Sequence, residues 1–167
     1  TTYEILNIGP GGVGDISKNG QFVCGMNYPA PAYIWSETTG RLELSVGECS
    51  EAYDVSNNGK VAGRFYDPTL PAPGGNPTLR AGYWENGSWN ALMGLSGLLP
   101  LDEMSFTHAY GISADGSTIV GMQWHPNWKV EAVRWVNGNI TGLGQTFGEN
   151  SRANVVSSDG SIVAGWN

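Results

Sequence analysis

An aromatic residue recurs at one place in the sequence, close to a proline and to polar residues. It stands three positions after a glycine in Gly25-Met-Asn-Tyr28, Gly63-Arg-Phe-Tyr66 and Gly121-Met-Gln-Trp124, and a proline follows one or two positions later. Tryptophan and tyrosine rings stack on the C–H faces of sugar rings, and neighbouring polar groups bind the hydroxyls. The pattern therefore predicts a glycan-binding surface made of repeated loops.

The third of these stretches carries the most binding groups, because a second tryptophan follows the first within four residues. The candidate ligand-binding residues all belong to these loops and are Tyr28, Tyr66, Trp124, His125, Asn127 and Trp128. A second interpretation stays open: each ring folds back to cover its own sheet, and the proline only stiffens the connection. Exposure of the rings distinguishes the two.

Catalytic chemistry is sparse in this sequence. The two histidines have no metal-ligand spacing to cysteine or carboxylate, and no serine has the surroundings of a nucleophile elbow. Asp15 and Asp54 occupy matching places on expected inner strands, where paired carboxylates do acid–base work or hold a cation. Later repeats have Gly111 and Val155 there, which weakens this idea. We predict no catalytic residue, no metal ligand and no cofactor, and a glycan hydrolase or lyase is the least favoured function.

The elements that position these residues are repeated hairpins. Each begins with an apolar strand, turns at Ser-x-Asn-Gly or Ser-x-Asp-Gly, and continues into a second strand; the segments are 13–25, 52–63, 109–121 and 153–165. Asn-Gly and Asp-Gly supply the positive φ that a tight turn needs, and serine bonds back onto the turn backbone. A second hairpin with a tryptophan at a fixed place alternates with the first.

Two hairpins make a unit of four strands and about 40–50 residues, the period of a propeller blade. We predict an all-β fold, a β-propeller-like array in a single domain over residues 1–167. Its units are 10–47, 48–100, 106–145 and 150–167, the last completed by 1–9. Trp35, Trp84 and Trp135 are expected to be equivalent and buried on the third strand of each unit. A β-sandwich and a β-solenoid are the alternatives.

The fourth unit has only one hairpin, and Tyr3–Ile8 is similar to the last strand of a unit. We expect this segment to pair beside the strand that ends at Gly165, because an apolar strand with a bare edge aggregates. Pairing within one chain gives a monomer, and pairing between two chains gives a homodimer. In either case, deletion of residues 1–8 is expected to destabilise the fold.

Composition limits the partners. The formal net charge is −7, from 8 basic and 15 acidic residues, and no basic cluster is present. This argues against a nucleic acid and against an anionic membrane surface. No apolar run approaches the ~18 residues of a membrane span. Cys24 and Cys49 either pair in an oxidising compartment or are small buried thiols, and their places in the repeat favour free thiols.

Four features of the unit form a recognisable set: the strand Ala32-Tyr-Ile-Trp35, the Asn-Gly turns, the Leu143-Gly144 pair and the hairpin that ends in Ile-Val-Gly121. With these features the unit resembles the HAF repeat of predicted bacterial extracellular proteins. The histidine of the naming motif is absent, since its places hold Pro31, Arg80 and Glu131. The resemblance implies the fold and a secreted, extracellular or periplasmic location, but it brings no catalytic residue and no ligand.

These observations together predict an extracellular binding module with glycan as its partner. The alternative is a structural or protein-interaction unit of a surface protein, whose loops contact protein and bind no sugar.

Overall fold

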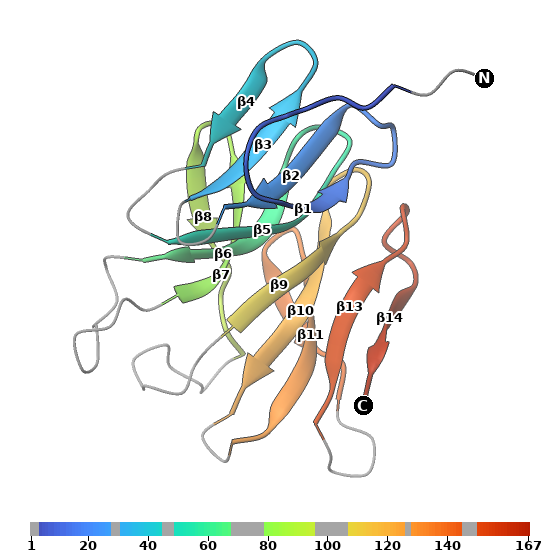
Figure 1. Cartoon of the computed structure of the whole chain (residues 1–167). Coiled ribbons are helices and arrows are strands. Elements are labelled where there is room, and N and C mark those ends of the chain that lie inside the picture. Colours follow the sequence, from blue (N-terminus) through green and yellow to red (C-terminus); the bar gives the residue numbers. More distant parts are fainter. Residues whose placement is uncertain are drawn as a thin grey trace.

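The computed structural model describes residues 4–27, 31–44, 49–67, 79–95, 107–125, 128–144 and 150–167. These residues form four antiparallel sheets, three with four strands and one with two (Figure 1). Within each sheet the strands are neighbours in chain order, so every sheet is a meander of consecutive hairpins. The prediction of an all-β, β-propeller-like array is confirmed.

Each sheet lies within one of the predicted units. The first sheet contains β1 (Gly12–Ile16), β2 (Phe22–Met26), β3 (Ala32–Ser36) and β4 (Gly40–Glu43). The second contains β5 (Ser50–Val55), β6 (Val61–Tyr66), β7 (Leu79–Glu85) and β8 (Ser88–Ala91). The third contains β9 (Thr107–Ile112), β10 (Thr118–Trp124), β11 (Val130–Val136) and β12 (Asn139–Gly142). The last contains β13 (Arg152–Val156) and β14 (Val163–Trp166).

The turn between the first and second strand of each sheet is held by its serine, as the sequence predicts. A backbone N–H five or four residues later donates to the serine Oγ at 2.9–3.0 Å; the pairs are Phe22–Ser17, Lys60–Ser56, Thr118–Ser113 and Ile162–Ser157. The glycine of each turn has φ between 73° and 81°. Only glycine adopts this conformation without steric cost.

The second hairpin of the second and third sheets turns at Asn-Gly. Asn86 and Gly87 have φ values of 52° and 84°, and Asn137 and Gly138 have 49° and 81°. Positive φ at both central residues defines the type I′ turn, whose twist matches that of the flanking strands.

The sheets stack face to face in chain order, and apolar residues fill the space between them. The core between the first and second sheets is built around Cys24, Leu44, Val55, Val61, Phe65, Trp84 and Trp89. The next is built around Ala62, Leu92, Ile112, Ile119, Val133 and Trp135, and the smallest around Val120, Ala132, Ala153 and Val156. Each core therefore belongs to a pair of neighbouring sheets.

The third-strand tryptophans occupy equivalent places, as predicted. Each pairs with an apolar residue at or next to the start of the second strand, namely Val23, Val61 or Ile119. Trp84 and Trp135 are buried, but Trp35 is only half-buried, so the prediction of burial is wrong for it. Trp84 and Trp135 join the core shared with the preceding sheet, and the first sheet has no preceding sheet among the described residues.

The N-terminal strand expected over residues 3–8 is absent from its described part. Residues 4–8 form no strand, Ile5 is 98% exposed, and the sheet of β13 and β14 has two strands. The segment cannot pair with β14 because the two lie at opposite ends of the stack of sheets. The N-terminal segment leads into β1 at one end of the stack, while β14 lies at the other end (Figure 1). The last sheet packs on β9, β10 and β11, with no comparable packing on the first sheet, so the described residues form an open arc.

Both cysteines are free thiols. Cys24 lies in the first core, and burial raises its pKa to about 12, as expected for an inert structural thiol. As for membrane insertion, the described part of the chain has no helix of the length and apolarity that a span requires.

Candidate functional site

The predicted binding loop of the third sheet is a tight connection between β10 and β11. The backbone N–H of His125 donates to the carbonyl of Lys129 at 2.8 Å, and that of Trp128 donates to the carbonyl of His125 at 3.0 Å. These bonds close the loop and place Trp128 at φ 62°, in the left-handed region. For a residue other than glycine this conformation costs about 1–2 kcal/mol.

Trp128 is also exposed. Its relative accessibility is 69%, whereas Trp124 at the end of β10 is half-buried. The ring centroids are 6.5 Å apart and the ring planes meet at 84°, an edge-to-face contact. The two indoles therefore form an aromatic corner, defined by Trp124 and Trp128, of which the Trp128 side faces solvent.

His125 anchors this loop to the neighbouring strand. Its Nε2 lies 2.9 Å from Glu131 Oε2, and Glu131 Oε1 accepts the N–H of Gly144 at 3.1 Å. The second sheet has an equivalent brace in which the acidic and basic side chains are exchanged, because Arg80 Nη1 lies 3.0 Å from Asp67 Oδ2. This repetition gives His125 a structural contact that is independent of any ligand.

The remaining predicted site residues are less informative. Tyr66 ends β6 in a half-buried position, while Tyr28 and Asn127 lie outside the described residues. The ends of β6 and β10 point to the same side of the array as the beginnings of β9 and β13 (Figure 1). We call this the loop side. The structure thus brings Trp124, His125 and Trp128 together on the loop side.

Sequence reasoning missed a polar cluster on the inner strands, near the loop side. Its members stand at two equivalent places of the first strand in successive sheets: Glu51, His108 and Arg152 at one, Tyr53, Tyr110 and Asn154 at the other. The signal was present in the repeat alignment as Glu-Ala-Tyr, His-Ala-Tyr and Arg-Ala-Asn. Comparison of these triplets, each centred on a buried alanine, would have identified the cluster.

Hydrogen bonds and ion pairs connect the members of this cluster across the sheets. Arg64 binds Glu51 with two nitrogens, at 2.6 and 2.7 Å, and Tyr53 donates its hydroxyl proton to the same carboxylate. Arg64 Nη1 lies 3.4 Å from His108 Nε2, and the Tyr110 hydroxyl lies 3.1 Å from His108 Nδ1. The second and third sheets are therefore joined by polar contacts as well as by their core.

The surroundings shift the protonation equilibria of the cluster. Burial, and then the Arg64 guanidinium, lowers the pKa of His108 to about 4, so the imidazole is neutral at pH 7. Burial alone would raise the pKa of Glu51, but the bonds from Arg64 and Tyr53 lower it on balance. The Glu51 carboxylate and the Arg64 guanidinium therefore pair with each other, and the neutral His108 lies beside this pair. The cluster thus joins the two sheets.

Arg152, on the first strand of the last sheet, connects that sheet to this cluster. Its guanidinium lies over the Tyr110 ring at 4.7 Å and over the Trp166 ring at 5.5 Å, and its Nε donates to Asn154 Oδ1 at 3.1 Å. Cation–π contacts of this kind contribute about 0.5–2 kcal/mol each. They fix the orientation of the last sheet on the third.

The Asp15 and Asp54 carboxylates lie close together, which is one possibility that the sequence raises. Both Asp54 carboxylate oxygens, however, accept hydrogen bonds from backbone amides. The N–H groups of Val55 and Ile112 donate to its two oxygens at 2.7 and 2.8 Å. Burial, then the contact with Asp15, raises the pKa of Asp54 to about 7. Within the described residues no three histidine, cysteine or acidic side chains gather as a metal site requires. The pair is thus a joint between sheets.

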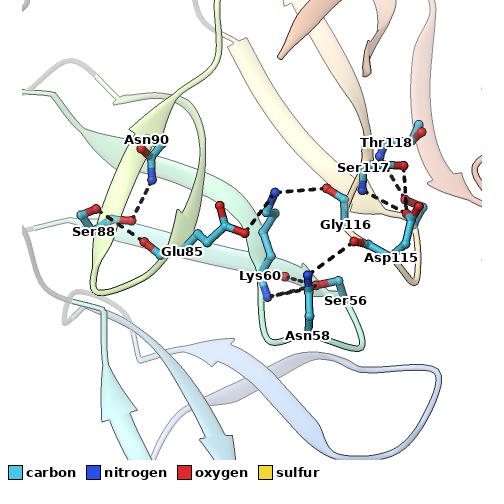
Figure 2. Close-up of polar contacts among 11 residues, drawn as sticks. Ser56, Asn58, Lys60, Glu85, Ser88, Asn90, Asp115, Gly116, Ser117 and Thr118 are labelled. Carbon is cyan, nitrogen blue, oxygen red and sulfur yellow. Dashed lines mark hydrogen bonds and ion pairs between the residues drawn. The ribbon is translucent and has the colours of Figure 1, made fainter. Parts of the chain in front are cut away.

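The opposite side of the array, which carries the first turn of each sheet, has a groove between the second and third sheets. Its volume is about 240 Å³ and its lining includes Lys60, Tyr83, Ser117, Trp135 and Asn137. Figure 2 shows the contacts at its rim: Lys60 Nζ lies 3.3 Å from Glu85 Oε1 and donates to the carbonyl of Gly116 at 3.3 Å. The ammonium group is therefore used to join the two sheets.

Comparisons with known proteins bear on the fold alone. No protein-family model matches the sequence, and no curated protein sequence matches it. Among solved structures, the chain is similar to the crystal structure of TolB from Acinetobacter baumannii, with a TM-score of 0.58 and 14% sequence identity. The similarity covers 90% of this chain and 36% of TolB, so the chain spans about a third of the length of that protein. The similarity to this β-propeller protein supports the architecture read from the repeats.

Proposed function

We propose that this chain is an extracellular or periplasmic glycan-binding module, and that the aromatic corner of Trp124 and Trp128 is its contact with sugar. The observation that carries the proposal is Trp128, which is 69% exposed and has φ 62°. A large apolar side chain in solvent and a left-handed backbone are each unfavourable. Their coincidence at one residue is typical of a functional position.

The corner suits a pyranose ring better than it suits a flat or charged ligand. One indole face stacks on the C–H face of the sugar, and the second ring, nearly perpendicular, limits the direction of approach. The backbone bonds that close the loop and the brace from Glu131 to His125 hold the platform rigid before binding. A rigid platform loses little conformational entropy when a ligand binds.

Repetition supports the same proposal. Tyr66 occupies the matching place on the second sheet, on the same side of the array. Single sugar contacts are weak, and several sites on one face raise the affinity for a polymer through effective concentration. The natural ligand is then a repeating glycan, such as those displayed outside the cytoplasm.

The test is a glycan array with the wild-type chain and three variants. Trp128→Gly removes the exposed ring and places glycine where φ is positive, so the loop geometry is retained. Trp124→Ala removes the other ring. Leu143→Ala, the control, removes another exposed apolar side chain of the same sheet, with an accessibility of 44%.

We expect wild type and the control to bind the same glycans and both tryptophan variants to lose binding. In Trp128→Gly the relief of backbone strain, about 1 kcal/mol, offsets the lost ring contact of similar size. Its urea midpoint therefore stays close to that of wild type, which separates loss of binding from loss of fold. A silent array for wild type, or glycan binding that survives Trp128→Gly, contradicts the proposal.

The alternative, a structural or protein-interaction unit, is favoured by a different observation. The first and the last sheet each expose apolar side chains on the face that has no neighbouring sheet. We propose no catalytic role for Asp15 and Asp54, because Asp54 is engaged by two backbone amides.

A further inference from the structure

The contacts between successive sheets repeat on the side that carries the first turns. In the first three sheets, the residue that begins the second strand or directly precedes it packs on the turn glycine of the next sheet. A Cβ placed on Gly59 would lie 3.2 Å from the Phe22 ring, one on Gly116 would lie 3.3 Å from Lys60 Cδ, and one on Gly160 would lie 2.6 Å from Thr118 Oγ1. Each such glycine therefore accommodates a side chain from the sheet before it.

This series has two free ends. The fourth residue in it is Ile162, which is 67% exposed. The first glycine in it is Gly20, and a Cβ there would meet nothing within 4 Å. Among the described residues, the last sheet thus has a side chain, Ile162, with no glycine to pack on. The first sheet has a turn glycine, Gly20, on which no described side chain packs.

Backbone-to-backbone hydrogen bonds between the turns follow the same order at the two joints after the first, whereas at the first joint the Asn19 N–H donates to Asn57 Oδ1. Asn57 N donates to the carbonyl of Ala114 at 2.8 Å, and Ala114 N donates to the carbonyl of Ser158 at 3.0 Å. Figure 2 shows a neighbouring side-chain bond, from Asn58 Nδ2 to the carbonyl of Asp115 at 3.4 Å. The donor that would continue this series is the N–H of Ser158, and the matching carbonyl on the first sheet is that of Lys18.

The two free sheet faces both carry exposed apolar side chains. On β1, Val13 is 63% exposed and Ile16 is 51% exposed, although their counterparts Ala52 and Val55 are buried between sheets. On the last sheet, Val155 is 58% exposed and Trp166 is 49% exposed. Contiguous apolar surface on a folded protein is typical of an interaction site.

The N-terminal segment leaves the inner part of the first sheet uncovered. Residues 4–9 lie near the outer half of the first sheet, where a Cβ on Gly9 would lie 3.3 Å from Arg41 Cδ. The inner strand β1 keeps its apolar side chains exposed. The last sheet has two strands, β13 and β14, and therefore fits the inner half, β1 and β2, without displacing the N-terminal segment.

We infer that a second copy of this chain occupies these faces, head to tail, with β13 and β14 of one copy packed on β1 and β2 of the next. The contact repeats the joint between sheets within one chain: Ile162 packs on Gly20, and Ser158 N–H donates to the Lys18 carbonyl. A head-to-tail contact uses two different surfaces, so copies form a closed ring when the rotation closes and a longer assembly otherwise. This inference is independent of glycan binding.

The test is molar mass by light scattering over a range of concentration, with the intact chain and four variants. The mass of one copy is 17.8 kDa, and we expect wild type to reach at least twice that value as concentration rises. Ile162→Lys alters the last sheet and Ile16→Glu alters the first. Each positions a charge in an apolar contact and should raise the dissociation constant at least about tenfold.

Mixing distinguishes a head-to-tail contact from a symmetric one. Ile162→Lys and Ile16→Glu each carry one altered face, so in the mixture the unaltered last sheet of Ile16→Glu can pack on the unaltered first sheet of Ile162→Lys. We expect the mixture to associate although each variant alone is monomeric. Leu42→Lys, at a site 52% exposed outside both faces, and Trp128→Gly should associate as wild type does.

Monomeric mass at every concentration overturns the inference. Association that persists in both Ile162→Lys and Ile16→Glu also overturns it. Far-ultraviolet circular dichroism of each variant confirms that the strands are retained, and since both substituted side chains are more than half exposed, we expect no loss of fold.

Discussion

The carboxyl group of Asp54 and the imidazole of His108 are buried ionisable groups with opposite effects on stability. The pKa of Asp54 is raised to about 7, above its usual 3.8, so the folded protein holds a proton that the unfolded chain releases between pH 4 and 7. Its contribution to stability is present below pH 4 and is lost as pH rises to 7. The pKa of His108 is lowered from 6.5 to about 4, so its contribution is present above pH 6.5 and is lost as pH falls to 4.

We therefore predict that the two effects largely cancel in wild type between pH 4 and 6.5 and separate in the variants. In Asp54→Asn the free energy of unfolding should rise with pH over this range, because the histidine effect remains. In His108→Gln it should fall with pH, because the aspartate effect remains. Each slope approaches at most about 1.4 kcal/mol per pH unit. Urea unfolding at pH 4.5, 5.5 and 6.5 measures both, and slopes of the same sign would contradict the assignment.

The third-strand tryptophans show that the contribution of a side chain to stability depends on whether a neighbouring sheet covers it. Trp135 is 1% exposed, and its Nε1 donates to the Met93 carbonyl at 2.7 Å across the joint with the second sheet. Trp35 has the same place in the repeat but no described sheet in front of it.

We predict that Trp135→Ala destabilises the fold by about 3–5 kcal/mol, as for other fully buried large aromatics. Trp35→Ala should cost only about 1–2 kcal/mol for the isolated chain, since part of that ring is already in water. Chemical denaturation at low protein concentration measures both. Equal costs would show that the face of the first sheet is covered.

This difference marks the limit of what the sequence can predict. The Ser-x-Asn-Gly and Asn-Gly turns predict the hairpins, their order and the equivalence of Trp35, Trp84 and Trp135, because turn conformation depends on local residues. Exposure depends on which sheets stack on one another. The repeat therefore predicts a buried Trp35, whereas the structure has it half-buried. The exposure of Trp128 follows from the backbone hydrogen bonds that close its loop, and no local sequence motif predicts these bonds. The cluster around His108 needs three sheets to form and was visible only by alignment of the units.

The N-terminal segment has a smaller role in the isolated chain than its apolar sequence suggests. Leu6 is 60% exposed, and residues 4–8 pair with no strand. The expectation that deletion of residues 1–8 destabilises the fold relied on that pairing. We now predict that the deletion lowers the free energy of unfolding by less than about 1 kcal/mol, as for other exposed segments without packing. Thermal unfolding of the truncated chain tests this, and a large loss would show that the segment pairs in solution.

Stability should also vary along the array. The core shared by the third and last sheets is the smallest, and the last sheet has two strands with one edge open. In a linear array each unit depends on its neighbours, so the end unit opens first. We predict that amides of β13 and β14 exchange hydrogen faster than those of β6 and β10. Uniform protection in an exchange experiment would contradict this order.

The joint described on the turn side has a consequence for how such a chain lengthens by gene duplication. A turn glycine that accommodates a side chain of the sheet before it recurs at all three joints, and a backbone N–H donates to the carbonyl of the next turn at the two joints after the first. A duplicated unit inserted between two sheets therefore meets a compatible surface on both sides at once. The fold can therefore gain or lose whole units without changes to its cores. We expect related proteins to differ in the number of their units.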